Sequence, residues 1–299
     1  MRHIPPRMGT FQQAPGPNPH AGPPVHAPPP PEVRGGVVVL PPKAPVSPTV
    51  YASALPEIVL PICAGPTIYA ITSLAPGEAN RTKQIASIQS WQQAGCKVVA
   101  VQGPSEHWNG TEWPGVIFAT ANVSTYYAGA FIPISSLAAW ATRNASPQDS
   151  IFLVNADCSL AIGKDVMGSL AARCADGLCY FVRHDVGPGQ ESLRHSCGVD
   201  GFLFRADLSS VVRPTEGLCM GKPWWDWIVP MAFKNAGRTL YNPSFMSLSH
   251  QLHAQRWSNE DWMMARASAA RAYAIDLARF TGEMRAEIAS VTHSIRLER

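Results

Sequence analysis

The sequence predicts an α/β fold: a mixed, mainly parallel sheet flanked by helices, with a disordered proline-rich N-terminal tail and a long C-terminal helix. Three observations predict it. The first 48 residues hold 15 of the 28 prolines. From residue 67 onwards, short apolar runs alternate with helical stretches. A strand, a helix and a strand follow one another between residues 67 and 101, and the right-handed crossover of such a unit makes its strands parallel.

The composition changes near residue 55. Residues 1–55 hold four basic and one acidic residue and the rest of the chain holds twenty of each, so the net charge of +3 lies in the tail. We expect the tail to be a disordered tether, or alternatively a docking peptide for a proline-reading domain. The neutral remainder argues against a nucleic-acid partner, because phosphate binding needs a clustered basic face.

The cysteines and the apolar runs bear on the compartment. The seven cysteines are odd in number and lack the spacing of a disulfide framework, which favours reduced thiols. The N-terminus lacks the apolar core of a secretory signal, and no run of about 18 apolar residues predicts a membrane span. We therefore expect a soluble, cytoplasmic protein.

The first βαβ unit is the clearest local pattern. Residues 67–72 form an apolar strand, and the helix 79–94 that follows places Ile85, Ile88 and Trp91 on one face before Gly95 ends it. Further strands are predicted at 97–101, 116–119, 151–154, 178–183, 201–205 and 238–241. Further helices are predicted at 134–142, 164–173, 206–212 and 224–236.

The C-terminal segment, 258–299, reads as a helical extension of a domain that spans 56–257. Ser258 and Asp261 form a capping box at its start. Apolar residues then recur three or four positions apart at Tyr273, Leu277, Phe280, Met284, Ile288, Val291 and Ile295. We expect this stripe to pack on the domain, with a weak helix-pair dimer as the alternative.

The strand 151–154 ends in the first candidate site. Asn155 and Asp157 are separated by one residue, so both side chains are able to point into the crevice beyond the sheet. A hard cation such as Mg2+ or Mn2+ prefers oxygen ligands, and nucleotide phosphates fill its other positions. The alternative is that Asp157 merely starts a turn.

A second candidate, Asp226, stands among Trp224, Trp225 and Trp227 at a predicted helix start. The helix dipole keeps such a carboxylate ionised, and the aromatic rings are able to form a wall for a sugar ring. The alternative is a core cluster in which Asp226 is a cap. Downstream, His250 or His253 is placed to complete a metal or phosphate site.

Taken in order, these features resemble the GT-A nucleotide-sugar glycosyltransferases, over roughly residues 66–257. The resemblance implies that Asn155 and Asp157, at the position of the family's Asp-x-Asp motif, bind Mn2+ or Mg2+ and the donor diphosphate. It implies that Asp226 is the base that activates the acceptor. The family's metal-binding histidine corresponds to His250 or, less closely, to His253.

The resemblance extends to the nucleotide contacts. It implies that Thr72 and Ser73, at the end of the first strand, contact the nucleotide, and that residues 198–201, with Gly201, form a glycine-containing loop in the donor site. Trp224 and Trp225 are expected beside the donor. Two departures are evident, because Asn155 and Trp225 stand where the family has acids.

The function that the resemblance implies is metal-assisted transfer of a sugar from a nucleotide-diphosphate donor to an acceptor hydroxyl. A base separate from the metal implies inversion at the anomeric carbon. One alternative is a non-catalytic sugar- or nucleotide-binding module tethered by the tail, which Asn155 favours. Another is a metal-dependent hydrolase that uses Asp157, Asp185 and the histidines.

Overall fold

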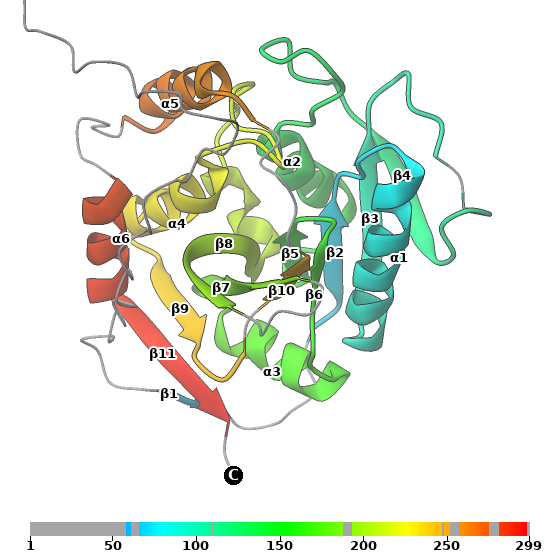
Figure 1. Cartoon of the computed structure of the whole chain (residues 1–299). Helices are drawn as coiled ribbons and strands as arrows, with labels where there is room; N and C mark the ends of the chain where they lie inside the picture. Colours follow the sequence, from blue (N-terminus) through cyan, green and yellow to red (C-terminus); the bar gives the residue numbers. More distant parts are fainter. Residues whose placement is uncertain are drawn as a thin grey trace, which may run out of the picture. The chain divides into compact units, whose positions relative to one another are not determined.

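The computed structural model describes residues 58–60, 66–108, 110–187, 193–246, 248–251, 257–274 and 281–297. These residues form an eleven-stranded sheet with helices on both faces (Figure 1). The predicted α/β class, with a mixed and mainly parallel sheet, is confirmed. The predicted tail, 1–55, lies outside the described residues.

Most elements lie within a few residues of their predicted positions. The strands are β1 Ile58–Leu60, β2 Ile68–Thr72, β3 Lys97–Gln102, β4 Val116–Thr120, β5 Ser150–Val154, β6 Cys158–Ser159, β7 Gly177–Val186, β8 Leu193–Arg205, β9 Thr239–Pro243, β10 Leu248–Gln251 and β11 Thr292–Leu297. The helices are α1 Glu78–Gln93, α2 Ile134–Asn144, α3 Lys164–Arg173, the 3-10 helix η1 Ala206–Val211, α4 Trp225–Asn235, α5 Asn259–Tyr273 and α6 Thr281–Ser290. The strands β1, β6, β10 and β11 were not predicted.

The strand order places several strand ends at one edge of the sheet. The order is β1-β11-β9-β7-β8-β5-β2-β3-β4, and β8 is antiparallel to its neighbours β5 and β7. The short strand β10 runs parallel to β7 and antiparallel to β6. The carboxyl ends of β2, β5, β7 and β10 therefore share one edge, which is where ligands bind in open α/β sheets.

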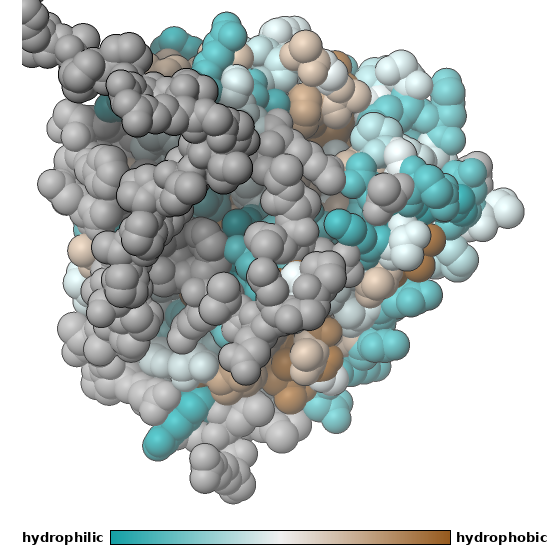
Figure 2. Space-filling model, in the orientation of Figure 1, coloured by the Kyte–Doolittle hydropathy of each residue, from teal (hydrophilic) through white to brown (hydrophobic). Residues whose placement is uncertain are grey.

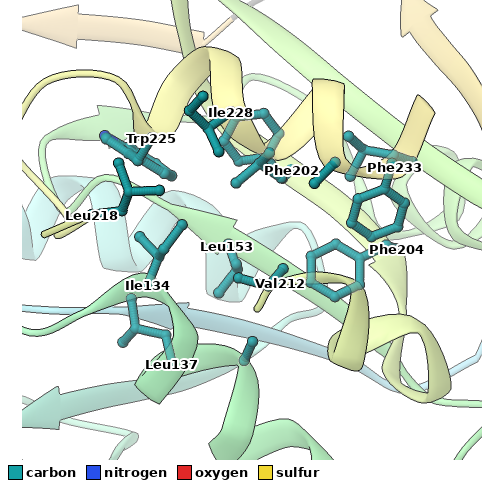
Figure 3. Packing of buried hydrophobic residues seen from close by; sticks show 14 of the residues in the cluster. Ile134, Leu137, Leu153, Phe202, Phe204, Val212, Leu218, Trp225, Ile228 and Phe233 are labelled. Atoms are coloured by element: carbon teal, nitrogen blue, oxygen red, sulfur yellow. The ribbon is translucent and has the colours of Figure 1, made fainter. Parts of the chain in front are cut away.

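Alternating side chains give the sheet two cores. On β5, Ile151 and Leu153 face one core, and Phe152 and Val154 face the other. Helices α2, α4, α5 and α6 contribute to the first core, and α1 and α3 to the second. Figure 3 shows the first core, with Leu153 and Phe202 of the sheet opposite Ile228 of α4. Full burial of a large apolar side chain stabilises a fold by about 1.5–3 kcal/mol.

The C-terminal segment corrects the prediction of one long helix. The capping box of Ser258 and Asp261 is present at the start of α5. However, α5 ends at Ala274, whose φ of 50° is left-handed, and the chain later forms α6 and then β11. The physical reason is strand pairing: β11 pairs with β9 and β1, and this buries Ile295 completely. The expected helical stripe therefore does not continue to Ile295, which lies in β11, and Leu277 and Phe280 lie outside the described residues. The helix-pair dimer stays an untested alternative.

The surface seen in Figure 2 is largely hydrophilic over α1 and the loops beside β4. Large apolar side chains are exposed at separate places, such as Ile117 on β4 and Met263 on α5. Among the described residues, no helix combines the length and the apolar character that crossing a membrane requires.

Candidate functional site

The end of β5 is joined to β7 and β8 by a network of charged and amide groups. The backbone N–H of Asn155 donates to the carbonyl of Asp200 at 3.1 Å, and its side-chain amide donates to Asp200 Oδ1 at 2.8 Å. Arg183 Nη1 donates to Asp200 Oδ2 at 2.7 Å. Asp200, which is 4 % exposed, therefore binds both the amide that follows β5 and the guanidinium of β7. Its part in the site was not predicted.

His250 lies between two carboxylates. The register of β10 sets His250 beside Asp185 of β7 and beside Cys158 of β6, the residue after Asp157. His250 Nδ1 is 2.7 Å from Asp185 Oδ1, and Nε2 is 3.6 Å from Asp157 Oδ2. The predicted association of His250 with Asp157 is thus present in the geometry, and it arises from the pairing of two strands that the sequence did not predict.

Opposing effects act on the pKa of His250. Burial lowers it, but the hydrogen bond and the negative charge of Asp157 raise it and prevail, and Asp200 raises it further against Arg183. The pKa of His250 is therefore above its ordinary value, because the carboxylate of Asp157 beside its ring favours the charged form.

Each ring nitrogen of His250 faces a different carboxylate, so Asp185 and Asp157 have different roles beside it. When neutral His250 donates its Nδ1–H to Asp185, its Nε2 faces Asp157, the arrangement of a metal-binding histidine oriented by a carboxylate. The described residues contain no group of three or more His, Cys, Asp or Glu side chains suited to hold a metal. Asp157 and His250 are two neighbouring side chains of ligand type, one short of such a group.

Arg183 links the two halves of this network. Besides its hydrogen bond to Asp200, its Nε lies 3.2 Å from Asp185 Oδ1, close enough for an ion pair although not aligned as a hydrogen bond. Gly198 makes room for it, since a Cβ there would lie 2.6 Å from Arg183 Nε. The alternation of Arg183 and Asp185 along a strand was the available sequence signal for this link.

Asp226 lies in the first turn of α4, with its side chain partly accessible to solvent. Burial, and then the charge of Asp200, raises the pKa of Asp226 to about 7, against the opposing charges of Arg183 and Arg285. The residue at the N-cap is Trp224, and no side chain caps the helix, so Asp226 is not the cap of the alternative interpretation. A carboxyl group that titrates near neutral pH suits proton transfer.

The tryptophans around Asp226 do not form the predicted sugar wall. Trp225 is 2 % exposed and meets Phe202 edge-to-face at 5.3 Å, and Figure 3 shows it in the core between Leu218 and Ile228. Trp224 packs on Trp262 of α5 with ring centroids 4.9 Å apart. Because both indole rings are buried against other aromatic side chains, neither Trp224 nor Trp225 exposes a ring face on which a sugar could stack.

Trp227 is also buried, at 7 % exposure, and the guanidinium of Arg285 lies 4.9 Å from its ring centroid. This contact fixes the end of the Arg285 side chain beside α4. Arg285 is one of the two cations that act on the pKa of Asp226, so Trp227 contributes to the surroundings of Asp226 through Arg285.

The residues expected at the nucleotide are buried to different degrees. Thr72 is completely buried, with its hydroxyl 3.4 Å from the sulfur of Met220, so its side chain is not presented to a ligand. Ser73 is partly exposed beyond the end of β2. His253 lies outside the described residues.

The predicted glycine-containing loop at 198–201 is a part of β8. Gly201 pairs with Val154 of β5 and Phe181 of β7, and a Cβ on it would lie 2.7 Å from Leu248. This glycine allows β10 to approach the sheet. The expected loop is therefore corrected to a strand, in which Gly201 serves packing.

The geometry also bears on the hydrolase alternative, which requires Asp157 and Asp185 around one metal. The two carboxylates contact opposite nitrogens of the His250 ring, so the imidazole separates them. The structure brings Asp157 together with His250 instead, while the charges of Asp200 and Arg183 act on the pKa of Asp226.

A scan against protein-family models and a search of curated protein sequences found no match. Among solved structures, the chain is similar to a mannosyltransferase from Pyrobaculum calidifontis in complex with GDP-Man and Mn2+, at a TM-score of 0.49 and 12% identity over 79% of this chain and 73% of that one. It is similar to GalNAc-T7 with UDP, GalNAc and Mn2+, at a TM-score of 0.44 and 8% identity over 69% of this chain and 47% of that one.

A putative glucose-1-phosphate thymidylyltransferase from Bacillus anthracis is a further match, at a TM-score of 0.39 and 8% identity over 72% of this chain and 99% of that one. The fold class rests on the strand order and the two layers of helices.

Proposed function

We propose that this protein is a glycosyltransferase that moves a sugar from a nucleotide-diphosphate donor to an acceptor hydroxyl with the help of a divalent cation. One observation carries the proposal: the charges of the Arg183–Asp200 ion pair act both on His250, which lies beside Asp157, and on Asp226, a carboxyl whose pKa is near 7. Donor activation and proton removal need these two kinds of group at one site.

The donor half of the site consists of Asp157 and His250. Asp157 Oδ2 and His250 Nε2 would hold Mn2+ or Mg2+, and Asp185 orients the ring through Nδ1. When bound, the cation supplies positive charge that stabilises the departing diphosphate. The side-chain nitrogen of Asn155 donates to Asp200, so a contact of Asn155 with the cation or the donor would be made by its Oδ1.

The acceptor half consists of Asp226. The acceptor oxygen forms a bond to the anomeric carbon as the bond from that carbon to the diphosphate oxygen breaks, and the acceptor proton passes to the Asp226 carboxylate. The N-terminal end of α4 favours the ionised form. A base separate from the cation places attack opposite the leaving group, which gives inversion.

A panel of nucleoside diphosphates and nucleotide sugars, with and without Mn2+, tests this proposal. Binding at one hundred times the dissociation constant adds about 2.7 kcal/mol of stability, which a thermal-shift measurement detects. A donor found in this way is then incubated with candidate acceptors, and the product is sought by mass spectrometry. Mn2+-dependent donor binding followed by product formation is the expected result, and no binding by any member would contradict it.

A non-catalytic binding module is the second candidate. The amide of Asn155 supports it, because this residue stands where the family's metal motif has a carboxylate. Donor binding without transfer to any acceptor, and without hydrolysis of the donor, would favour this candidate.

A further inference from the structure

The backbone at the start of α4 is strained. Trp224 has φ 78° and ψ −27°, a left-handed conformation that is rare for a bulky residue. Its carbonyl accepts the N–H groups of Trp227 at 3.1 Å and Ile228 at 2.9 Å, so this conformation sets where α4 begins. Such strain persists only when surrounding contacts hold it, and it is often found at functional sites.

Two side-chain pairs hold the strained segment against the first turn of α5. Lys222 Nζ lies 3.0 Å from Asp261 Oδ2, and the ring of Trp224 lies 4.9 Å from that of Trp262. We call these four residues the α5 clamp. The clamp holds the chain before α4 at two points, Lys222 and Trp224, and each contacts a residue in the first turn of α5. Two points of attachment fix both the position and the direction of the chain that leads to Asp226.

The Lys222 side chain is confined to one place. It is 7 % exposed, and its ammonium lies 4.7 Å from the ring centroid of Tyr127 and 4.1 Å from that of Phe131. A buried ammonium is costly to leave unpaired, and here two aromatic faces and a carboxylate compensate for its lost hydration. Asp261 is held in turn by the N–H of Ser258 at 2.9 Å.

We propose that Lys222 is a positioning residue for Asp226, holding the start of α4 against α5 and thereby fixing the place of the first turn of α4, which carries Asp226. That this positioning serves catalysis rests on the proposed function. That Lys222 positions Asp226 does not rest on it, because only contacts within the protein are involved.

The charges around Asp226 make the role measurable. Within the described residues, those that act on Asp226 are Asp200 on β8, Arg183 on β7 and Arg285 on α6. Lys222 instead pairs with Asp261. Loss of the Lys222 ammonium therefore alters the titration of Asp226 by moving its carboxyl, and the direct loss of one charge has little effect on it.

The experiment is a double-mutant cycle read at several pH values without any ligand. Asp226→Asn removes a carboxylate whose ionisation destabilises the fold, so in the parent protein it should raise the melting temperature by several degrees at pH 8 and by clearly less at pH 5. In a Lys222→Met background, this pH-dependent gain should shrink by roughly half or more, because the displaced carboxyl gains solvent.

A matched control breaks an ion pair at the other end of α4. Lys234 Nζ lies 2.6 Å from Glu287 Oε1, and Lys234→Met should leave the gain from Asp226→Asn unchanged. If Lys222→Met does not fold, Asp261→Asn removes the ion pair with Lys222 and keeps an oxygen that accepts the Ser258 N–H. The gain should shrink in the same way.

An undiminished gain in both the Lys222 and the Asp261 backgrounds would overturn the proposal. So would the absence of any pH-dependent gain in the parent, since Asp226 would then not occupy the buried position that the clamp holds. If no sugar transfer is found, the ligand-free melting results still test the positioning role of Lys222. If transfer is found but the gain in melting temperature from Asp226→Asn is the same in the Lys222→Met and Asp261→Asn backgrounds, the positioning role is rejected and the proposed function is kept.

Discussion

The ionisation of Asp226 affects both the stability of the fold and, in the proposed function, the rate of sugar transfer. Its pKa of about 7 in the folded protein exceeds the ordinary value of 3.8, because burial and Asp200 disfavour the charged form. The ionised form, which is the base in the proposed function, is therefore the form that the fold tolerates least. A trade of stability for activity of this kind is common at catalytic residues.

The rate of transfer should depend on the ionisation of Asp226. Above pH 7 the carboxylate accepts the acceptor proton, and below pH 7 it becomes protonated, so kcat should fall as the pH falls. Asp226→Asn should bind the donor normally and lose roughly 10^2- to 10^4-fold in kcat. A full pH–rate profile with donor titration measures both. Unchanged turnover in the variant would exclude Asp226 as the base.

Stability should change with pH in the opposite sense. Between about pH 4 and pH 7 the folded protein binds a proton at Asp226 that the unfolded chain does not, so this residue's contribution to stability falls as the pH rises. We expect Asp226→Asn to stabilise the protein at pH 8 by on the order of 2 kcal/mol, less than the full conversion of the shift because the side chain is partly accessible. Denaturant unfolding at pH 5 and pH 8 checks this.

Asp157 should matter for the cation more than for folding. Asp157→Ala removes the carboxylate beside His250 Nε2, and we expect Mn2+-dependent binding of nucleoside diphosphate to weaken at least tenfold by titration calorimetry. Asp207→Asn, which alters an ion pair with Arg205 on the surface, is the matched control and should bind normally. Equal affinity in parent and Asp157→Ala would remove Asp157 from the site.

At the scale of the elements, β7 and β8 carry the link between the two halves of the site. Arg183 crosses from Asp200 to Asp185 only because Gly198 leaves space for its side chain. The close approach of these two strands therefore shapes the site.

Gly198→Ala should displace Arg183. The added Cβ would lie 2.6–2.8 Å from three atoms of that side chain, and overpacking of this kind costs about 1–3 kcal/mol. Donor binding should weaken as well. Gly163→Ala is the control, since no atom lies within 4 Å of a Cβ there and the φ of −82° suits alanine. Equal melting temperatures for the two variants would contradict this account.

At the scale of the whole molecule, one edge of the sheet is built from residues at both ends of the domain. β1 pairs with β11, and β11 with β9, so the sheet joins residues near 58 to residues near 297. The composition of residues 1–55 predicts no core of their own.

A chain that begins at Leu55 should therefore melt within a few degrees of the full chain, because it keeps β1 and loses only the tail. A chain that begins at Pro66 should melt lower, since β11 then loses its parallel partner. Differential scanning fluorimetry of the three chains measures this. Strong destabilisation of the Leu55 chain would show that the tail stabilises the domain.

The sequence by itself determined the elements whose signals are local. The βαβ pattern, the helices 134–142 and 164–173, and the capping box at Ser258 all agree with the structure, because periodicity and caps act within one or two turns. Asp157, His250 and Asp226 were recognised as candidates because polar groups after strands and at helix starts are visible along the chain.

Only the tertiary structure decided what depends on distant partners. The helical spacing of Ile288, Val291 and Ile295 is overridden because β9 and β1 offer backbone hydrogen bonds to β11. Trp225 turned out to be core because Phe202 lies opposite it, and Asp200 entered the site because β8 passes between β5 and β7. Strand pairing and burial join residues far apart in sequence, and no local pattern encodes which of them meet.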